Sequence, residues 1–428
     1  MSIGFREPRL APTANPSNDT FLFISPIGSE MKRPLITVVI LFLLAMPACL
    51  LAQPNDTGAT QTPAKLPAFS WDTLPLYAHV RKATKFTPEE LKHLASFPLI
   101  TLEKTTGVKD YGSTDAGTIE AAKAIKQIDP TTKVLFYRNV IVHYPGYRYD
   151  DQLGSIPDAF LTSKKGEQNL VRGQNKAYDL SSEQLRKWWV ETMATTTNHK
   201  AIDGLFLDGN VKVLSSYLKR TLPDGKKEAV MRGFDQMMRD TRKALDPEKL
   251  MIANVLRARF DKGGLEFMDY FDGSYLEGFE HAVAGASKAD YLAKGIETAQ
   301  TAARQGKIIA LTLNVSKASM SDGVDEVHGH LKDFESIDQD RVNFCIALFL
   351  VVAERHSYFC LHDGYNINPR GRRPTTNALW LKSLPQYNKK LGAPKGPAVK
   401  QGYRYSREFE HASVKLNIES GKADIKWK

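Results

Sequence analysis

The chain contains few of the residues and motifs on which several common classes of protein depend. It has only 3 cysteines in 428 residues, too few for a disulfide framework. It also has no CxxC pair or His/Cys cluster typical of structural zinc sites. No glycine-rich turn follows its first predicted strand, which argues against a dinucleotide-binding fold. Its basic residues form no long run, so nucleic acid is not an expected partner despite a formal net charge of +10.

The remaining composition is that of a globular protein. Apolar residues make up 42% of the chain and charged residues 25%, which is too apolar a mixture for a disordered chain. The length accommodates two or three modest domains, or one large α/β barrel with an appendage. Cys345 and Cys360 stand among apolar residues, so we expect buried free thiols rather than a disulfide.

The first seventy residues differ in character from the rest. Met31 is followed by two cations and an apolar run that ends at Ala52, the form of a secretory signal peptide. We interpret 31–52 as that peptide, 1–30 as an extension upstream of the true start, and 53–70 as a linker. A membrane anchor is the alternative, and Cys49 is a weak candidate for lipidation. The expected location is secreted or periplasmic, with membrane attachment only through the signal peptide or a lipid on Cys49.

Between residues 71 and 384 the sequence alternates between predicted strands and predicted helices. The strands are expected at 74–80, 98–103, 133–139, 204–208, 250–254, 270–277, 307–313 and 357–361. Helices are expected at 116–128, 228–245, 289–305 and 340–353, with further helix starts at 87–90 and 181–183. Eight strands separated mostly by helices predict an α/β fold, the (β/α)8 TIM barrel, with a doubly wound sheet as the rival.

The last segment, 385–428, has a different pattern. Two stretches of alternating apolar and polar residues, 414–418 and 423–427, flank Ser420 and Gly421. This alternation predicts a small β hairpin appended to the barrel.

Two acidic residues follow predicted strands, at the ends where barrel enzymes hold their active sites. Asp208 ends the fourth strand and precedes Gly209, which lets the backbone turn sharply. Asp208 could instead cap a turn. Glu277 ends the sixth strand between Tyr275 and Phe279. Aromatic neighbours would partly desolvate this carboxyl and favour its protonated form, although a solvated loop glutamate is the alternative.

Together the two acids indicate glycoside hydrolysis, which needs one carboxylate as nucleophile or base and one carboxylic acid as proton donor. Aromatic rings and amides at the same strand ends are candidates for binding sugar rings and hydroxyls, although each singly could be core packing. The candidate substrate-binding residues are Tyr137, Asn139, Tyr144, Asn254, Tyr275 and His356.

The ordered set of motifs resembles a known group of proteins. The segments 204–209 (Gly-Leu-Phe-Leu-Asp-Gly), 275–279 (Tyr-Leu-Glu-Gly-Phe) and 391–394 with 405–409 are similar to those of the family-15 hypothetical glycosyl hydrolases, over about 71–427. The resemblance implies a TIM-barrel glycosidase with Asp208 as nucleophile or base and Glu277 as acid. The strand pair is similar to that of the clan of α-galactosidases and α-glucosidases. That clan usually has Asp on strand six, so the glutamate leaves retention or inversion open.

The sequence therefore predicts an exported glycoside hydrolase that acts through Asp208 and Glu277 on an oligo- or polysaccharide, with α-glycosides as the candidate linkage. No metal, organic cofactor or stable protein partner is expected. A catalytically inactive carbohydrate-binding barrel at the cell surface is the alternative. A lyase or deacetylase is a further one, although the sequence shows no His/Asp cluster for a metal-dependent deacetylase.

Overall fold

The computed structural model describes residues 65–280, 285–315, 338–362, 364–365, 367 and 380–428. The chain divides into two units, Met1–Thr60 and Gln61–Lys428, and all the described residues belong to the second. The upstream extension at 1–30, the signal peptide at 31–52 with Cys49, and the linker up to residue 64 lie outside the described residues.

Eight parallel strands form one sheet in the order of the chain. They are β1 (Ala78–Val80), β2 (Leu99–Leu102), β3 (Lys133–Asn139), β4 (Gly204–Asp208), β5 (Leu250–Asn254), β6 (Gly273–Leu276), β7 (Ile308–Asn314) and β8 (Ser357–His362). The sheet closes where the Tyr77 N–H donates to the Phe359 carbonyl and the Phe359 N–H donates to the Pro75 carbonyl, both at 2.8 Å. The predicted (β/α)8 barrel is confirmed.

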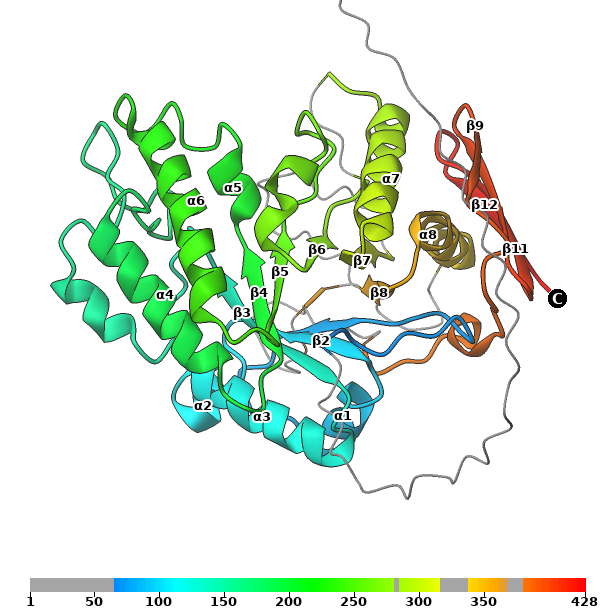
Figure 1. Cartoon of the computed structure of the whole chain (residues 1–428), viewed down its shortest axis with the longest axis horizontal. Coiled ribbons are helices and arrows are strands. Elements are labelled where there is room, and N and C mark those ends of the chain that lie inside the picture. The colour runs from blue at the N-terminus through cyan, green and yellow to red at the C-terminus, as the bar shows by residue number, and fades with distance from the viewer. Residues whose placement is uncertain (1–64, 281–284, 316–337, 363, 366, 368–379) are drawn as a thin grey trace, which may run out of the picture. The chain divides into compact units, whose positions relative to one another are not determined.

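Helices connect the strands and cover the outside of the barrel (Figure 1). They are α1 (Pro88–Leu94), α2 (Val108–Tyr111), α3 (Thr114–Ile128), α4 (Glu183–Thr197), α5 (Asn210–Leu214), α6 (Lys226–Ala244), α7 (Lys288–Arg304) and α8 (Gln339–Val352). Shorter 3-10 helices are η1 (Asp150–Ser155), η2 (Leu265–Tyr270) and η4 (Pro385–Asn388). The start of α1 follows from its sequence, since Thr87 and Glu90 cap each other's backbone N–H groups.

The hydrophobic core has two parts. The larger lies between the strands and the helices, and the smaller fills the barrel with inward-facing side chains. Those inward residues are Tyr77, Leu99, Leu135, Tyr137, Phe206, Leu250, Ile252, Tyr275, Ile308, Ala310 and Tyr358. Side chains alternate along a strand, so the residue two positions after each of these also points inward. That residue lies nearer the C-terminal end of the barrel, which we call its mouth.

The N-terminal end of the barrel is covered by the last residues of the segment interpreted as a linker. Leu66 and Phe69 pack against the inner core, and the Tyr358 hydroxyl bonds to the carbonyls of Pro67 and Ala68 at 3.0 and 3.1 Å. Residues 65–70, which the sequence analysis assigns to a linker, therefore pack against the barrel.

The C-terminal appendage is a sheet of four antiparallel strands rather than the expected two-stranded hairpin. It consists of β9 (Val399–Gln401), β10 (Arg404–Glu408), β11 (Ala412–Asn417) and β12 (Lys422–Trp427). Figure 1 shows this sheet beside α8. The two strands missed by the sequence pattern are short or mostly polar, with exposed residues throughout β9.

Arg407 joins the appendage to the barrel. It is 2% exposed, and its guanidinium donates to the carbonyls of Leu350 and Ala353 at the end of α8 and to Glu354, the last at 3.1 Å. Glu354 also pairs with Arg304 at 3.2 Å.

We expect Arg407→Met to lower the free energy of unfolding by about 3 kcal/mol, because it leaves buried carbonyls and a carboxylate without their donor. Urea denaturation followed by tryptophan fluorescence measures this change. Arg404→Met, on the exposed face of the same strand, is the matched control and should change the free energy by less than about 0.5 kcal/mol. Equal effects of the two substitutions would contradict the role of Arg407.

The two thiols are free, as expected from the sequence. Cys345 lies on α8 and is fully buried, and Cys360 lies on β8. Burial raises the pKa of both thiols to about 12, so neither is a reactive thiolate at neutral pH.

Candidate active site

Polar side chains form a ring at the C-terminal end of the barrel, directly above the inner core. Asn139 stands two residues after buried Tyr137, and Asp208 stands two residues after buried Phe206. The same spacing relates Asn254 to Ile252 and Glu277 to Tyr275. The alternation of a strand therefore turns all four polar side chains toward the barrel axis.

Asp208 is held by four donors. Its Oδ2 accepts from the Tyr137 hydroxyl at 2.7 Å and from Asn139 Nδ2 at 3.2 Å. Its Oδ1 accepts from the Gly209 N–H at 2.7 Å and from Asn254 Nδ2 at 3.1 Å. Four donors on two oxygens fix the orientation of the carboxyl group before any ligand binds.

Gly209 is required by this arrangement. Its φ is +82°, and a Cβ atom there would lie 2.4 Å from Asn139 Oδ1. That same oxygen accepts from the N–H groups of Ile141 and Val142 at 3.1 and 2.7 Å. The amide of Asn139 is thereby oriented, with its NH2 toward Asp208.

The environment favours the ionised form of Asp208. Burial by itself would raise the pKa of this carboxyl. The Tyr137 hydrogen bond, the charge of Lys104, the Gly209 N–H and the charge of Lys212 outweigh burial and lower the pKa below its usual value. Asp208 is therefore a carboxylate at neutral pH.

Asn254 links Asp208 to Glu277. Its Nδ2 donates to Asp208 Oδ1 at 3.1 Å and to Glu277 Oε2 at 3.0 Å. The two carboxyl oxygens therefore lie within about 6 Å of each other. Asn254 Oδ1 accepts from the Arg257 guanidinium, which fixes the amide with its NH2 toward the acids. The structure thus brings the two predicted acids together.

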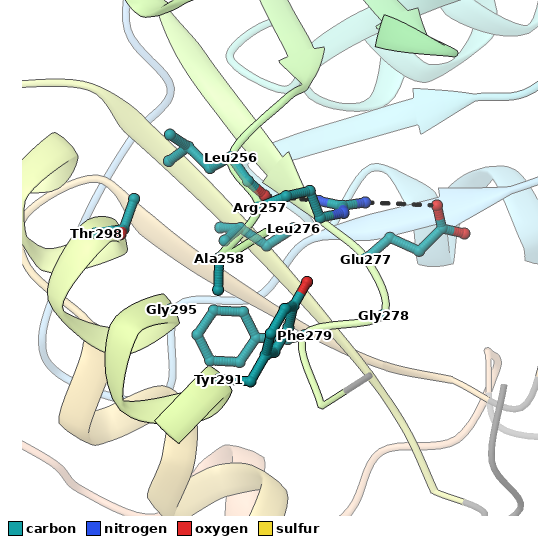
Figure 2. A pocket seen from close by; sticks show the side chains of 10 residues that line it. All are labelled: Leu256, Arg257, Ala258, Leu276, Glu277, Gly278, Phe279, Tyr291, Gly295 and Thr298. Atoms are coloured by element: carbon teal, nitrogen blue, oxygen red, sulfur yellow. Dashed lines mark hydrogen bonds and ion pairs between the residues drawn. The ribbon is translucent and has the colours of Figure 1, made fainter. Parts of the chain in front are cut away.

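Glu277 is partly buried and has polar neighbours. Its side chain is 36% exposed, and its Oε1 accepts from the Tyr365 hydroxyl at 2.9 Å. Arg257 Nη2 lies 4.0 Å from its Oε2, a pair drawn in Figure 2. In the same view Phe279 points toward Gly295 of α7, away from the carboxyl group. Glu277 is therefore partly buried, and the side chains that contact its oxygens are polar, while the Phe279 ring packs elsewhere.

The cavity in Figure 2 borders Glu277 and Arg257. It is lined by apolar side chains of the loops after β5 and β6 and by α7, among them Leu256, Ala258 and Phe279. Its volume of about 10 Å³ holds a single water molecule. A sugar ring cannot enter it, so the C-terminal end of the barrel, where the two acids meet, is the candidate substrate site.

The expectation that Tyr137 and Tyr275 offer ring faces to sugars is also wrong. Both are 1% exposed because their rings belong to the inner core. Tyr137 holds Asp208, and the Tyr275 hydroxyl bonds to the Tyr365 hydroxyl at 2.6 Å. These tyrosines position the acids from below. Tyr144 is half-buried at the mouth, with the Lys104 ammonium 5.0 Å from its ring centre.

His356 is not part of this group. It directly precedes β8 and contacts the Phe69 ring, at 5.5 Å between ring centres, so it lies at the end of the barrel opposite the acids. The sequence suggested a site residue because the histidine adjoins a strand, but it adjoins the start of that strand. His362, the last residue of β8, lies at the mouth and stacks on Tyr365 at 4.7 Å.

Tyr365 and Lys104 were missed by the sequence analysis. Lys104 donates to both oxygens of Glu103 at 3.0 Å and lies over the Tyr137 ring at 4.8 Å. Lys104 follows the end of β2, and Tyr365 follows the end of β8. Their positions after strand ends, the criterion that selected Asp208, could have indicated them. Tyrosine and lysine are common at such turns, however, so their presence alone does not predict a site.

We expect Tyr137→Phe to move the acid limb of the pH–kcat/KM profile to higher pH. In the wild type, the hydrogen bond from the Tyr137 hydroxyl lowers the pKa of Asp208. Without this bond the pKa rises, so the carboxylate becomes protonated at a higher pH. The value of kcat/KM at the optimum should fall about tenfold. Tyr147→Phe is the control, since its hydroxyl donates to the Tyr137 backbone carbonyl at 3.1 Å. An unmoved acid limb in Tyr137→Phe would contradict the role of Tyr137.

Among the described residues, no three His, Cys, Asp or Glu side chains lie closely enough together to hold a metal ion. No helix in the same part of the chain is long and apolar enough to cross a membrane.

The sequence matches hypothetical glycosyl hydrolase family 15 over residues 126–413. No curated protein sequence matches it. Among solved structures, the chain is similar to a family-36 α-galactosidase from Geobacillus stearothermophilus, with a TM-score of 0.43 and 11% identity over 82% of this chain and 48% of that one. It thus spans about half the length of that enzyme. A maltogenic α-amylase from Thermotoga neapolitana gives a TM-score of 0.43 and 14% identity, over 81% of this chain and 86% of that one.

Proposed function

Because the chain belongs to hypothetical glycosyl hydrolase family 15, we propose that it hydrolyses O-glycosidic bonds by a two-carboxylate mechanism. The observation that carries this proposal is the amide of Asn254, which donates to Asp208 and Glu277 at 3.1 and 3.0 Å. One carboxylate of lowered pKa and one partly exposed carboxyl group lie at the same end of the barrel. Glycoside hydrolysis requires such a pair.

In the proposed mechanism Asp208 attacks the anomeric carbon while Glu277 gives its proton to the departing glycosidic oxygen. Glu277, now a carboxylate, takes a proton from water, and this water releases the sugar from Asp208. Carboxyl groups lie about 5–5.5 Å apart in retaining enzymes and about 6.5–9.5 Å apart in inverting ones. Oxygens within about 6 Å of each other favour retention.

The proposed substrate is an oligo- or polysaccharide outside the cytoplasm. The apolar segment at 31–52 with its preceding cations supports export. An α-linkage is proposed from the order of the acids, aspartate after strand four and a carboxylic acid after strand six, which resembles the clan of α-galactosidases and α-glucosidases.

The test is to incubate the purified protein with a panel of glycans and measure the release of reducing ends. For a responsive glycan, ¹H NMR during the first turnovers identifies the anomer of the product. We expect hydrolysis with retention. Inversion would contradict Asp208 as nucleophile. Glycan binding without any release would contradict hydrolysis and favour a carbohydrate-binding barrel.

A further inference from the structure

Several basic side chains act electrostatically on the two acids at the mouth of the barrel. Lys212 lies on α5, four residues after Asp208, and its ammonium lies 5.2 Å from the centre of the Tyr217 ring. Its charge acts on Asp208, as does the charge of Lys104. Arg172 and Arg259 are near enough to repel Lys212. The acids that attract Lys212 are Asp208 and Glu277.

Two of the cations at the mouth are engaged with carboxylates of the protein. Lys104 donates to both oxygens of Glu103. Arg257 pairs with Glu277 and orients Asn254.

Lys212 differs from these two cations. Within the described part of the chain it makes no ion pair shorter than 4 Å, and its ammonium lies over an aromatic ring instead. Burial lowers the pKa of Lys212, and the repulsion from Arg172 and Arg259 lowers it further, against the attraction of Asp208 and Glu277. A bound anion beside the Lys212 ammonium would offset the cost of burying its charge.

Lys212 also stands on a rigid support. The Nζ of Lys227, which is 5% exposed, donates to the carbonyls of Lys212 and Val213 at 2.9 and 2.6 Å. These bonds fix the last turn of α5. Gly209 fixes its start, since the backbone there turns through a left-handed conformation directly after Asp208. The position of Lys212 relative to Asp208 is therefore set by the fold.

We propose that the substrate is an anionic glycan, and that Lys212 binds a carboxylate or sulfate group on the sugar next to the bond that is cleaved. This inference rests on the proposed hydrolysis and adds the chemical class of the substrate. An ammonium beside the nucleophile, among further cations, is a specific site for such a group. The net charge of +10 attracts a polyanion to the protein over a longer range.

The experiment compares matched pairs of substrates that differ only in charge. One pair is α-linked oligogalacturonate and its carboxyl-reduced form, and the other is a sulfated galactose oligosaccharide and its desulfated form. We expect kcat/KM of the wild type to be at least about tenfold higher on the charged member of one pair, and to fall as salt is added. The responsive pair identifies whether the group is a carboxylate or a sulfate.

Lys212→Met should reduce the preference for the charged member about tenfold, whereas Lys212→Arg should keep it. The decisive quantity is the ratio of kcat/KM on the charged substrate to kcat/KM on its uncharged partner. Losing the charge beside Asp208 changes the turnover of both substrates alike and leaves this ratio unaffected. Lys243→Met, an exposed lysine in the last turn of α6, is the control and should keep the ratio. An unchanged thermal unfolding midpoint verifies that the variants are folded.

The possible failures can be told apart. Cleavage with no preference for charge, or a Lys212→Met variant that keeps the preference, overturns the anionic substrate and leaves the hydrolysis standing. If no probe is cleaved, calorimetry with the same four probes decides the binding. Tighter binding of a charged member that depends on Lys212 supports the anion site without hydrolysis, and equal or absent binding overturns it.

Discussion

Asp208→Asn is expected to lower kcat/KM on any responsive glycan by about 10⁴-fold or more, the loss typical of removing a catalytic nucleophile. Asparagine keeps the shape of the side chain but cannot attack the anomeric carbon. Its environment is built for a carboxylate, since four donors converge on the two oxygens. The measurement is the initial rate of reducing-end release, with residual wild-type activity excluded by an independent preparation.

Replacement of Asp208 by a smaller side chain distinguishes a nucleophile from a residue that only supports the fold. Asp208→Ala leaves room for a small anion, and added azide should restore turnover and yield a glycosyl azide of inverted configuration. The unfolding midpoint of the variant should remain within a few degrees of the wild type. Wild-type turnover in either folded variant would remove Asp208 from the mechanism.

Glu277→Gln is expected to lower kcat/KM by about 10³-fold on natural glycans and by less than about tenfold on dinitrophenyl glycosides. A sugar alkoxide needs a proton to depart, whereas dinitrophenolate departs without one. The side chain is partly exposed and faces the same mouth as Asp208, so it can reach a departing oxygen. Rates on a series of aryl glycosides measure the dependence on the leaving group.

Glu248→Gln is the matched control for Glu277. Glu248 is exposed just before β5, at the opposite end of the barrel, and its replacement should leave both rates unchanged. Equal losses on natural and aryl substrates in Glu277→Gln would contradict a role as proton donor and indicate that Glu277 only positions the substrate.

The barrel and its acids were predictable because both depend on local sequence patterns. Apolar strands and helix caps are each formed by residues close together in the sequence, as in the capping box of Thr87 and Glu90. The position of Asp208 and Glu277 at one mouth then follows from parallel strands, whose C-terminal ends meet on one side. The spacing of two residues from Phe206 to Asp208 and from Tyr275 to Glu277 is a further signal, which the structure makes evident.

The remaining features depend on contacts between segments far apart in the chain. The sequence could not tell that Tyr137 and Tyr275 face inward, because inward and outward positions of a doubly covered strand are both apolar. The error on His356 arose from the direction of a strand, since a polar residue at its start and one at its end look alike. Tyr365 reaches Glu277 from 88 residues away in the sequence, a contact that no local pattern records.

The single amide of Asn254 has a consequence for how this enzyme family could be altered. Since one NH2 group supports both carboxyl groups, a displacement of the end of β5 disturbs Asp208 and Glu277 at once. A substitution in β5 therefore cannot change the position of one acid without changing that of the other. A change of sugar specificity that leaves both acids in place is therefore expected from substitutions in the loops above the ring rather than in β5.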